Sequence, residues 1–137
     1  MTTVKQIMKQ RIQPASPSDP VSVIAQIFMA SRMSVVPVCE GDKFKGIITE
    51  RDIISKVVAH GLDPDEVKAE MLMANDIPKL ETSTDIVEAA RVMANSGVHY
   101  LPVLNRTGKF VGLVTLDDLV SESLALAGMV LSKTSKG

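Results

Sequence analysis

One eight-residue pattern of glycine, threonine and aspartate occurs twice in the chain. Residues 46–53 read GIITERDI and residues 112–119 read GLVTLDDL, with Gly, Thr and Asp at the same spacing. A threonine hydroxyl can donate to a phosphate oxygen, and the two oxygens of an aspartate can accept from the two hydroxyls of a ribose. The pattern therefore suggests two sites for a nucleoside phosphate. They would be built from Thr49 with Asp52 and from Thr115 with Asp118.

The same spacing also has a purely structural explanation. Each pattern lies where a predicted strand meets a predicted helix, and a threonine followed three residues later by an acid is typical of a capping box. Aspartate also suits the positive end of a helix dipole. Gly46 and Gly112 would let another group approach the backbone closely. Both explanations can hold, and the ligand hypothesis requires Asp52 and Asp118 to face a cleft rather than only their own helices.

The elements that must position these residues follow one order in each half of the chain: strand, helix, strand, strand, helix. Apolar residues at helical spacing predict the first helices, and proline-containing apolar runs predict the central strands. Gly61 and Gly128 are expected to end the last helix of each half. In the first half we predict an extended piece near Ile12, a helix that contains residues 21–28, strands at 35–39 and 44–48, and a helix at 50–60. In the second half we predict an extended piece at 77–80, a helix that begins after Asp85, strands at 99–104 and 110–114, and a helix at 116–127.

The two halves form a long internal repeat. VKQIM at residues 4–8 is echoed by VKAEM at 67–71, and the central strands echo each other around Pro37 and Pro102. A repeat of this length with only two copies indicates a pair of packed subdomains rather than a solenoid. The expected class is α/β, of the α+β kind. The expected domains are a first repeat at 1–62, a linker helix at 63–75, a second repeat at 76–129 and a tail at 130–137.

Composition excludes several functional classes. The chain has 137 residues, 45 % of them hydrophobic, and a formal net charge of −1, so nothing indicates a general nucleic-acid binder. No apolar run is long enough for a bilayer span or a signal peptide, which predicts a cytoplasmic protein without a membrane partner. The single cysteine, Cys39, is read as a buried small hydrophobe. No activated nucleophile or acid–base pair is evident, so the chain is not expected to be an enzyme.

With these motifs assembled, the chain resembles the tandem cystathionine-β-synthase-type (CBS) domain proteins over residues 4–127. The resemblance rests on the order of the motifs, repeated twice, including SVVPV and GVHYLPV as the central strands. It implies a stand-alone Bateman module, in which two pseudo-symmetric units pack through their sheets. It also implies clefts that take AMP, ADP or ATP, or in some relatives S-adenosylmethionine or NAD. Such modules commonly form homodimers and signal to a regulated protein by a change of conformation.

The resemblance also implies roles for individual residues. The aspartates would bind ribose and the threonines would lie on the phosphate side, while the backbone before each proline would line the adenine. The cleft built mainly from residues 77–118 is expected to be the better-occupied site. Arg51, Lys79 and Arg106 are the candidates for neutralising the charge of the phosphates. The implied ligand residues are Ile12, Ser34, Val35, Val36, Pro37, Thr49, Arg51, Asp52, Ile77, Lys79, Val98, His99, Tyr100, Leu101, Pro102, Thr115 and Asp118.

Two alternatives stay open beside nucleotide sensing. One is a structural or oligomerisation module without a ligand, in which the Thr-x-x-Asp patterns are caps only. The other is a binder of S-adenosylmethionine or NAD. Metal and cofactor sites are not expected, because the adjacent carboxylates of Asp117 and Asp118 alone make a poor cation site.

Overall fold

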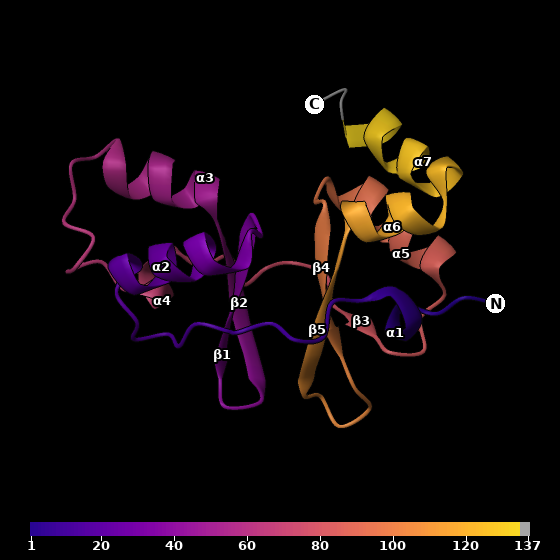
Figure 1. Cartoon of the computed structure of the whole chain (residues 1–137), viewed down its shortest axis with the longest axis horizontal. Helices are drawn as coiled ribbons and strands as arrows, with labels where there is room; N and C mark the ends of the chain where they lie inside the picture. Colours follow the sequence, from indigo (N-terminus) through magenta and orange to yellow (C-terminus); the bar gives the residue numbers. More distant parts are fainter. Residues whose placement is uncertain (135–137) are drawn as a thin grey trace. The chain divides into compact units, whose positions relative to one another are not determined.

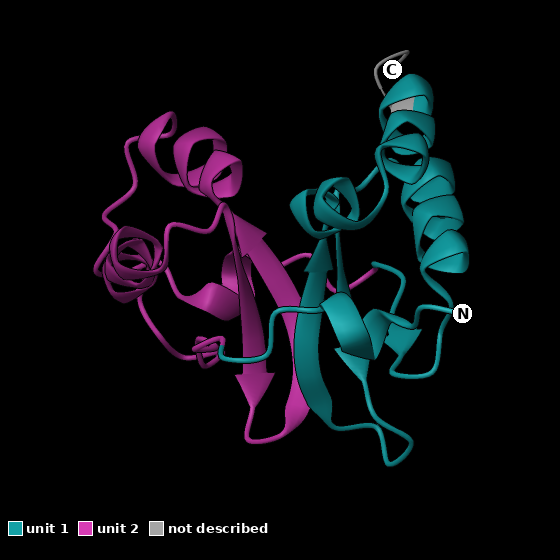
Figure 2. Cartoon of the chain, turned by 45° about the vertical axis from the view of Figure 1, so that its right-hand side comes forward, with its two compact units in different colours: residues 1–11, 77–137 teal, residues 12–76 magenta. Residues whose placement is uncertain are grey.

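The computed structural model describes residues 1–134, and the chain divides into two compact units. Unit 1 comprises Met1–Arg11 and the chain from Ile77 onward, whereas unit 2 comprises Ile12–Asp76 (Figure 2). These compact units do not coincide with the expected sequence repeats. Residues 1–11 belong to the unit of the second repeat, and the stretch expected to be a linker belongs to the unit of the first.

Unit 2 contains one hairpin with its helices (Figure 1). Strands β1 (Val35–Glu40) and β2 (Lys43–Thr49) pair antiparallel, with Val35 opposite Thr49. The chain then continues through α3 (Glu50–Ile53) into the π-helix η1 (Ile54–Val58), and the other helices are α2 (Val21–Ser31) and α4 (Ala69–Leu72). A core with Ile24, Val38 and Ile48 at its centre holds the unit together, because apolar faces of α2 and the hairpin meet there.

Unit 1 contains a three-stranded sheet with the order β3–β4–β5. Strand β3 (Leu80–Glu81) pairs parallel with β4 (Tyr100–Leu104), which pairs antiparallel with β5 (Phe110–Thr115). The helices are α1 (Val4–Ile7), α5 (Ile86–Ser96), α6 (Leu116–Glu122) and α7 (Leu124–Thr134). Met93, Leu101 and Leu119 are fully buried in its core. The repeated order of strands and helices confirms the predicted α+β class.

The opening strands are shorter than predicted, for a local reason. In unit 2 this segment makes only an isolated parallel bridge, between Ala15 and Val38, and in unit 1 it is the two-residue strand β3. Pro14 and Pro17 flank Ala15, and Pro78 precedes β3. Because proline has no N–H to donate, the ladder cannot extend past these positions.

The single helix predicted at 116–127 is divided at Ser123, whose backbone is extended, and its second part, α7, runs further than predicted. Gly128 does not end a helix but lies inside α7, which continues to Thr134. Ala127 and Val130 on this helix are 2 % and 0 % exposed. Burial of this face outweighs the low helix propensity of a single glycine. The expected tail is therefore helical up to Thr134, and residues 135–137 lie outside the described residues.

The long helices α2 and α5 end in the same backbone conformation with different residues. Gly97 ends α5 with φ +75° and Arg32 ends α2 with φ 59°, both left-handed. Glycine adopts this conformation without penalty, whereas arginine is strained there. Within residues 1–134, no helix is long and apolar enough to cross a membrane.

Candidate functional site

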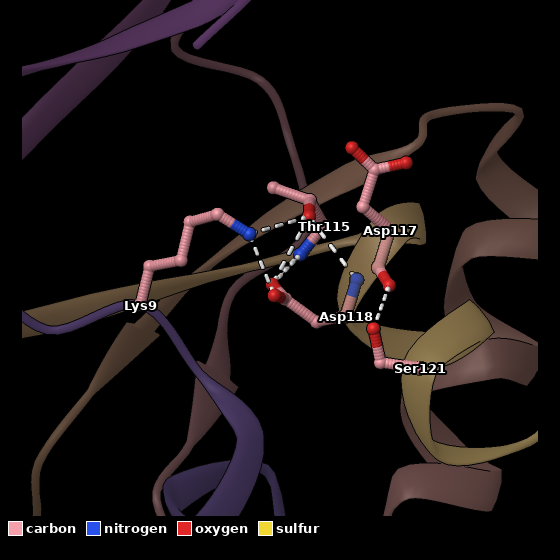
Figure 3. A network of polar contacts seen from close by, with 5 residues as sticks. All are labelled: Lys9, Thr115, Asp117, Asp118 and Ser121. Atoms are coloured by element: carbon pink, nitrogen blue, oxygen red, sulfur yellow. Dashed lines mark hydrogen bonds and ion pairs between the residues drawn. The ribbon is translucent and has the colours of Figure 1, made fainter. Parts of the chain in front are cut away.

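In unit 1, Thr115 and Asp118 form a capping box at the start of α6 (Figure 3). Asp118 Oδ2 accepts from the backbone N–H of Thr115 at 2.8 Å and from its hydroxyl at 3.0 Å. The backbone N–H of Asp118 donates in return to Thr115 Oγ1 at 3.4 Å. The capping hypothesis is thus confirmed for this copy, and it occupies one of the two carboxylate oxygens.

The second oxygen of Asp118 is bound by Lys9, a residue that the sequence did not single out. Lys9 Nζ lies 2.6 Å from Asp118 Oδ1 and 3.2 Å from Thr115 Oγ1. The ion pair is partly buried, with the Asp118 side chain 13 % exposed and that of Lys9 37 % exposed. Figure 3 shows Lys9 reaching this pair from the N-terminal segment, so a residue distant in sequence completes the cluster.

In unit 2, Thr49 and Asp52 repeat the capping box at the start of α3. Asp52 Oδ2 accepts from the backbone N–H of Thr49 at 2.8 Å, and the N–H of Asp52 donates to Thr49 Oγ1 at 3.1 Å. Here too a lysine contacts the other oxygen, with Lys56 Nζ 3.3 Å from Asp52 Oδ1. This lysine comes from the next turn of the same helical segment and its side chain is 52 % exposed.

The two lysines therefore reach equivalent carboxylates from different places. The segments that pair with the strands show the equivalence, because Lys9 bridges to Leu113 in unit 1 and Ala74 bridges to Ile47 in unit 2. The structural repeat aligns Lys9 with Ala74, and not with Leu72 as the match of VKQIM to VKAEM implies. That match is wrong by two residues. Because the equivalent residue in unit 2 is an alanine, the sequence repeat gives no signal for Lys9.

The two glycines of the repeated pattern admit neighbouring backbone. A Cβ on Gly112 would lie 2.6 Å from the carbonyl oxygen of Lys9, and one on Gly46 would lie 2.8 Å from that of Ala74. The predicted close approach is confirmed, and the approaching group is the segment that pairs with the strand. All three repeated residue types thus have roles in folding each unit.

The backbone before each central proline lies beside its capping box. Strand register places Tyr100 opposite Thr115 and Val35 opposite Thr49. The carbonyl of His99 accepts from the N–H of Leu116 at 2.8 Å, and the carbonyl of Ser34 accepts from the N–H of Glu50 at 3.2 Å. Each unit thus brings its own predicted strand residues next to its own threonine and aspartate.

The remaining predicted residues differ in how exposed they are. Arg51, His99 and Lys79 are exposed, whereas Ile12, Ile77, Val98 and Tyr100 are partly buried. The side chains of Val35, Val36, Pro37, Leu101 and Pro102 are buried, so these residues present only backbone to a ligand. Arg106 lies in the β4–β5 turn, at the opposite end of the hairpin from Thr115, which separates this candidate from the unit 1 cluster.

Other potentially reactive groups have structural surroundings. Burial, and to a smaller degree the Asp42 carboxylate, raises the pKa of the Cys39 thiol to about 11, so the reading as a buried hydrophobe is confirmed. His60 Nδ1 lies 3.0 Å from the carbonyl oxygen of Ser55 near a helix end. In Figure 3 the carboxylates of Asp117 and Asp118 point in different directions. Within residues 1–134, no three His, Cys, Asp or Glu side chains gather in a metal-binding group.

Comparison with known proteins agrees with this architecture. The sequence profile described as "CBS domain" matches the chain twice, at residues 4–59 and 67–125. The chain belongs to the CBS-domain family, as the motifs predict.

Individual relatives span different shares of their own length. An uncharacterized Methanopyrus kandleri protein, MK0525, is 37 % identical over 103 residues, which cover 75 % of this chain and 53 % of that protein. The chain therefore spans about half the length of this relative. The crystal structure of the CBS domain protein TA0289 from Thermoplasma acidophilum matches 98 % of this chain and 76 % of its own, with a TM-score of 0.85 and 25 % identity. The structure of CBSX2 in complex with AMP matches 92 % of this chain and 98 % of its own, with a TM-score of 0.77 and 20 % identity.

Proposed function

We propose that this protein is a non-enzymatic regulatory module that binds an adenosine ligand, AMP, ADP or ATP, and signals to a partner by a shift of conformation. One observation carries the proposal. In both units the capping box uses only Oδ2 of the aspartate and leaves Oδ1 in contact with a lysine ammonium. A second carboxylate oxygen beside a cation is suited to a sugar hydroxyl next to a phosphate.

The related CBSX2 protein, which was crystallised with AMP, supports this choice of ligand. Ligand would be held by Asp52 or Asp118 together with the adjoining strand backbone. A ligand that binds one conformation better than another shifts the population toward it, and a partner can detect that shift. Turnover of ATP by the purified protein would contradict the non-enzymatic part of the proposal.

Replacement of Asp118 by Asn tests the proposal directly. An amide has one oxygen and no charge, so it weakens the hydrogen bonds to the ribose. We expect AMP affinity to fall roughly tenfold or more, the usual loss for a charge-assisted hydrogen bond. Isothermal titration calorimetry measures the affinity for AMP, and titrations with ADP, ATP, S-adenosylmethionine and NAD rank the ligands. Asp52→Asn should do the same for unit 2.

The chain offers a matched control in Asp117, which is adjacent, exposed and directed away from the Asp118 carboxylate (Figure 3). Asp117→Asn removes the same charge and should leave AMP binding unchanged. Absence of heat with every ligand would instead favour the structural module, in which Asp118→Asn lowers only the melting temperature. If only S-adenosylmethionine or NAD gives a heat of binding, that compound takes the place of AMP, ADP and ATP as the proposed ligand.

We further propose a cytoplasmic homodimer formed through exposed apolar helix residues. Ile54 and Val58 of η1 are 63 % and 67 % exposed, and Leu124 at the start of α7 is 76 % exposed. Covering such side chains is a common driving force of association. Light scattering after gel filtration should give twice the chain mass, and Ile54→Lys with Leu124→Lys should shift it toward the monomer. Gln26→Lys is the control, since Gln26 is a polar residue exposed on α2 and its replacement adds the same charge without removing an apolar side chain. A monomeric wild-type protein at micromolar concentration would contradict the proposal.

A further inference from the structure

We infer that Lys9 determines the ligand specificity of the unit 1 cluster, by making it select nucleosides that carry a phosphate over the same nucleosides without one. The inference rests on the proposed function and adds a residue and a selectivity to it. Its basis is the contact of Lys9 Nζ with both Asp118 Oδ1 and Thr115 Oγ1.

The hydroxyl of Thr115 has no donor to spare for a phosphate. It donates its one hydrogen to Asp118 Oδ2 and accepts from the N–H of Asp118 and from Lys9 Nζ. A hydroxyl has one donor and two acceptor positions, so these three contacts use all of them. A phosphate bound at this cluster therefore needs its donor from another group.

Lys9 can supply that donor. An ammonium has three N–H donors, and two point to Asp118 and Thr115. No other contact of Lys9 Nζ exists within residues 1–134, which leaves the third donor for a phosphate oxygen. Lys9 also offsets the negative charge of Asp118, which by itself would repel an anionic ligand.

The backbone of Lys9 is fixed, so its side chain starts from a defined position. Its N–H donates to the carbonyl of Leu113 at 2.8 Å, and its carbonyl accepts from the N–H of Leu113 at 3.0 Å. Holding a charged group in place before the ligand arrives reduces the entropy lost on binding. Unit 2 has Ala74 at the equivalent position, and its Lys56 is the more exposed lysine. Phosphate selection should thus be stronger in unit 1.

AMP and adenosine provide the test, because they differ only in the phosphate. Calorimetry is done with both ligands in an Asp52→Asn background, so that the unit 1 cluster dominates the signal. Lys9→Met should weaken AMP binding roughly tenfold or more, by loss of a charge-assisted hydrogen bond, and leave adenosine binding equal or tighter. Lys9→Arg should keep most of the preference for AMP.

Lys5→Met is the matched control, because Lys5 is exposed on the same N-terminal segment. It should not change the AMP-to-adenosine ratio. An equal loss of both ligands in Lys9→Met, or an unchanged ratio, would overturn the inference and leave Lys9 with a structural role. If Lys9→Met does not fold, Lys9→Gln is judged by the same ratio. Failure of the wild-type protein to bind either ligand would overturn the proposed function, and this inference with it.

Discussion

A chain that lacks residues 1–11 is expected to lose the fold of unit 1 and to keep that of unit 2. The N-terminal segment is part of the unit 1 core, because Val4 is 0 % exposed and packs among residues of α5 and the sheet. It also exchanges backbone hydrogen bonds with Thr82, Thr84, Ile86 and Leu113. Unit 2 is a continuous stretch, Ile12–Asp76, and contains all residues of its own core.

The expected loss is large compared with the stability of a small domain. Burial of a valine side chain stabilises by about 1.5–3 kcal/mol. Each backbone hydrogen bond adds about 0.5–1.5 kcal/mol net, and the segment makes several. The sum approaches the roughly 5–15 kcal/mol that separates a typical folded domain from its unfolded chain. Removal of the segment should therefore unfold unit 1 at room temperature.

Hydrogen exchange with mass spectrometry measures the result unit by unit. Peptides of α5 and β5 should lose protection in the truncated chain, whereas those of β1 and β2 should keep it. Cys39 gives a second readout, because burial holds its thiol protonated and inaccessible while unit 2 is folded. Slow reaction of Cys39 with thiol reagents should persist after truncation. Retained protection of β5 would show that the N-terminal segment is dispensable.

The local structure around the two capping boxes could be predicted from the sequence, because residues close together in the chain determine it. Threonine and aspartate three residues apart determine the capping boxes, and the proline-containing apolar runs determine β1 and β4. Asp85 caps α5 as its position predicts, accepting from the N–H of Val87. Apolar residues at helical spacing predict α2 and α5 correctly, because one apolar face of each helix is buried.

The parts that could not be predicted depend on contacts between distant segments. Residues 1–11 follow the sequence order of the first repeat but pack in unit 1, and no local pattern reports which strand they pair with. Lys9 could not be predicted for the same reason, since its partner Asp118 lies 109 residues away. Gly128 illustrates a local preference that buried neighbours override, because Ala127 and Val130 hold α7 in the core.

Gly112→Ala is expected to destabilise unit 1 by about 1–3 kcal/mol, the usual range for overpacking a well-filled site. The added Cβ would lie 2.6 Å from Lys9 O and 2.8 Å from Met8 Sδ. Met8 can rotate away, but Lys9 O is backbone and is held by the hydrogen bonds with Leu113. The φ of Gly112 is not positive, so alanine fits the local backbone and the effect isolates the contact with the N-terminal segment.

The other glycines separate this contact from the general effect of adding a methyl group. Gly46→Ala should destabilise unit 2 in the same way, since its Cβ would lie 2.8 Å from Ala74 O. Gly128→Ala meets nothing within 4 Å inside α7 and should be neutral or stabilising by up to about 1 kcal/mol. Urea unfolding followed by circular dichroism compares the three variants. If Gly112→Ala unfolds like the wild type, the N-terminal segment yields to the methyl group, and the approach of Lys9 to β5 is not what requires glycine in the repeated pattern.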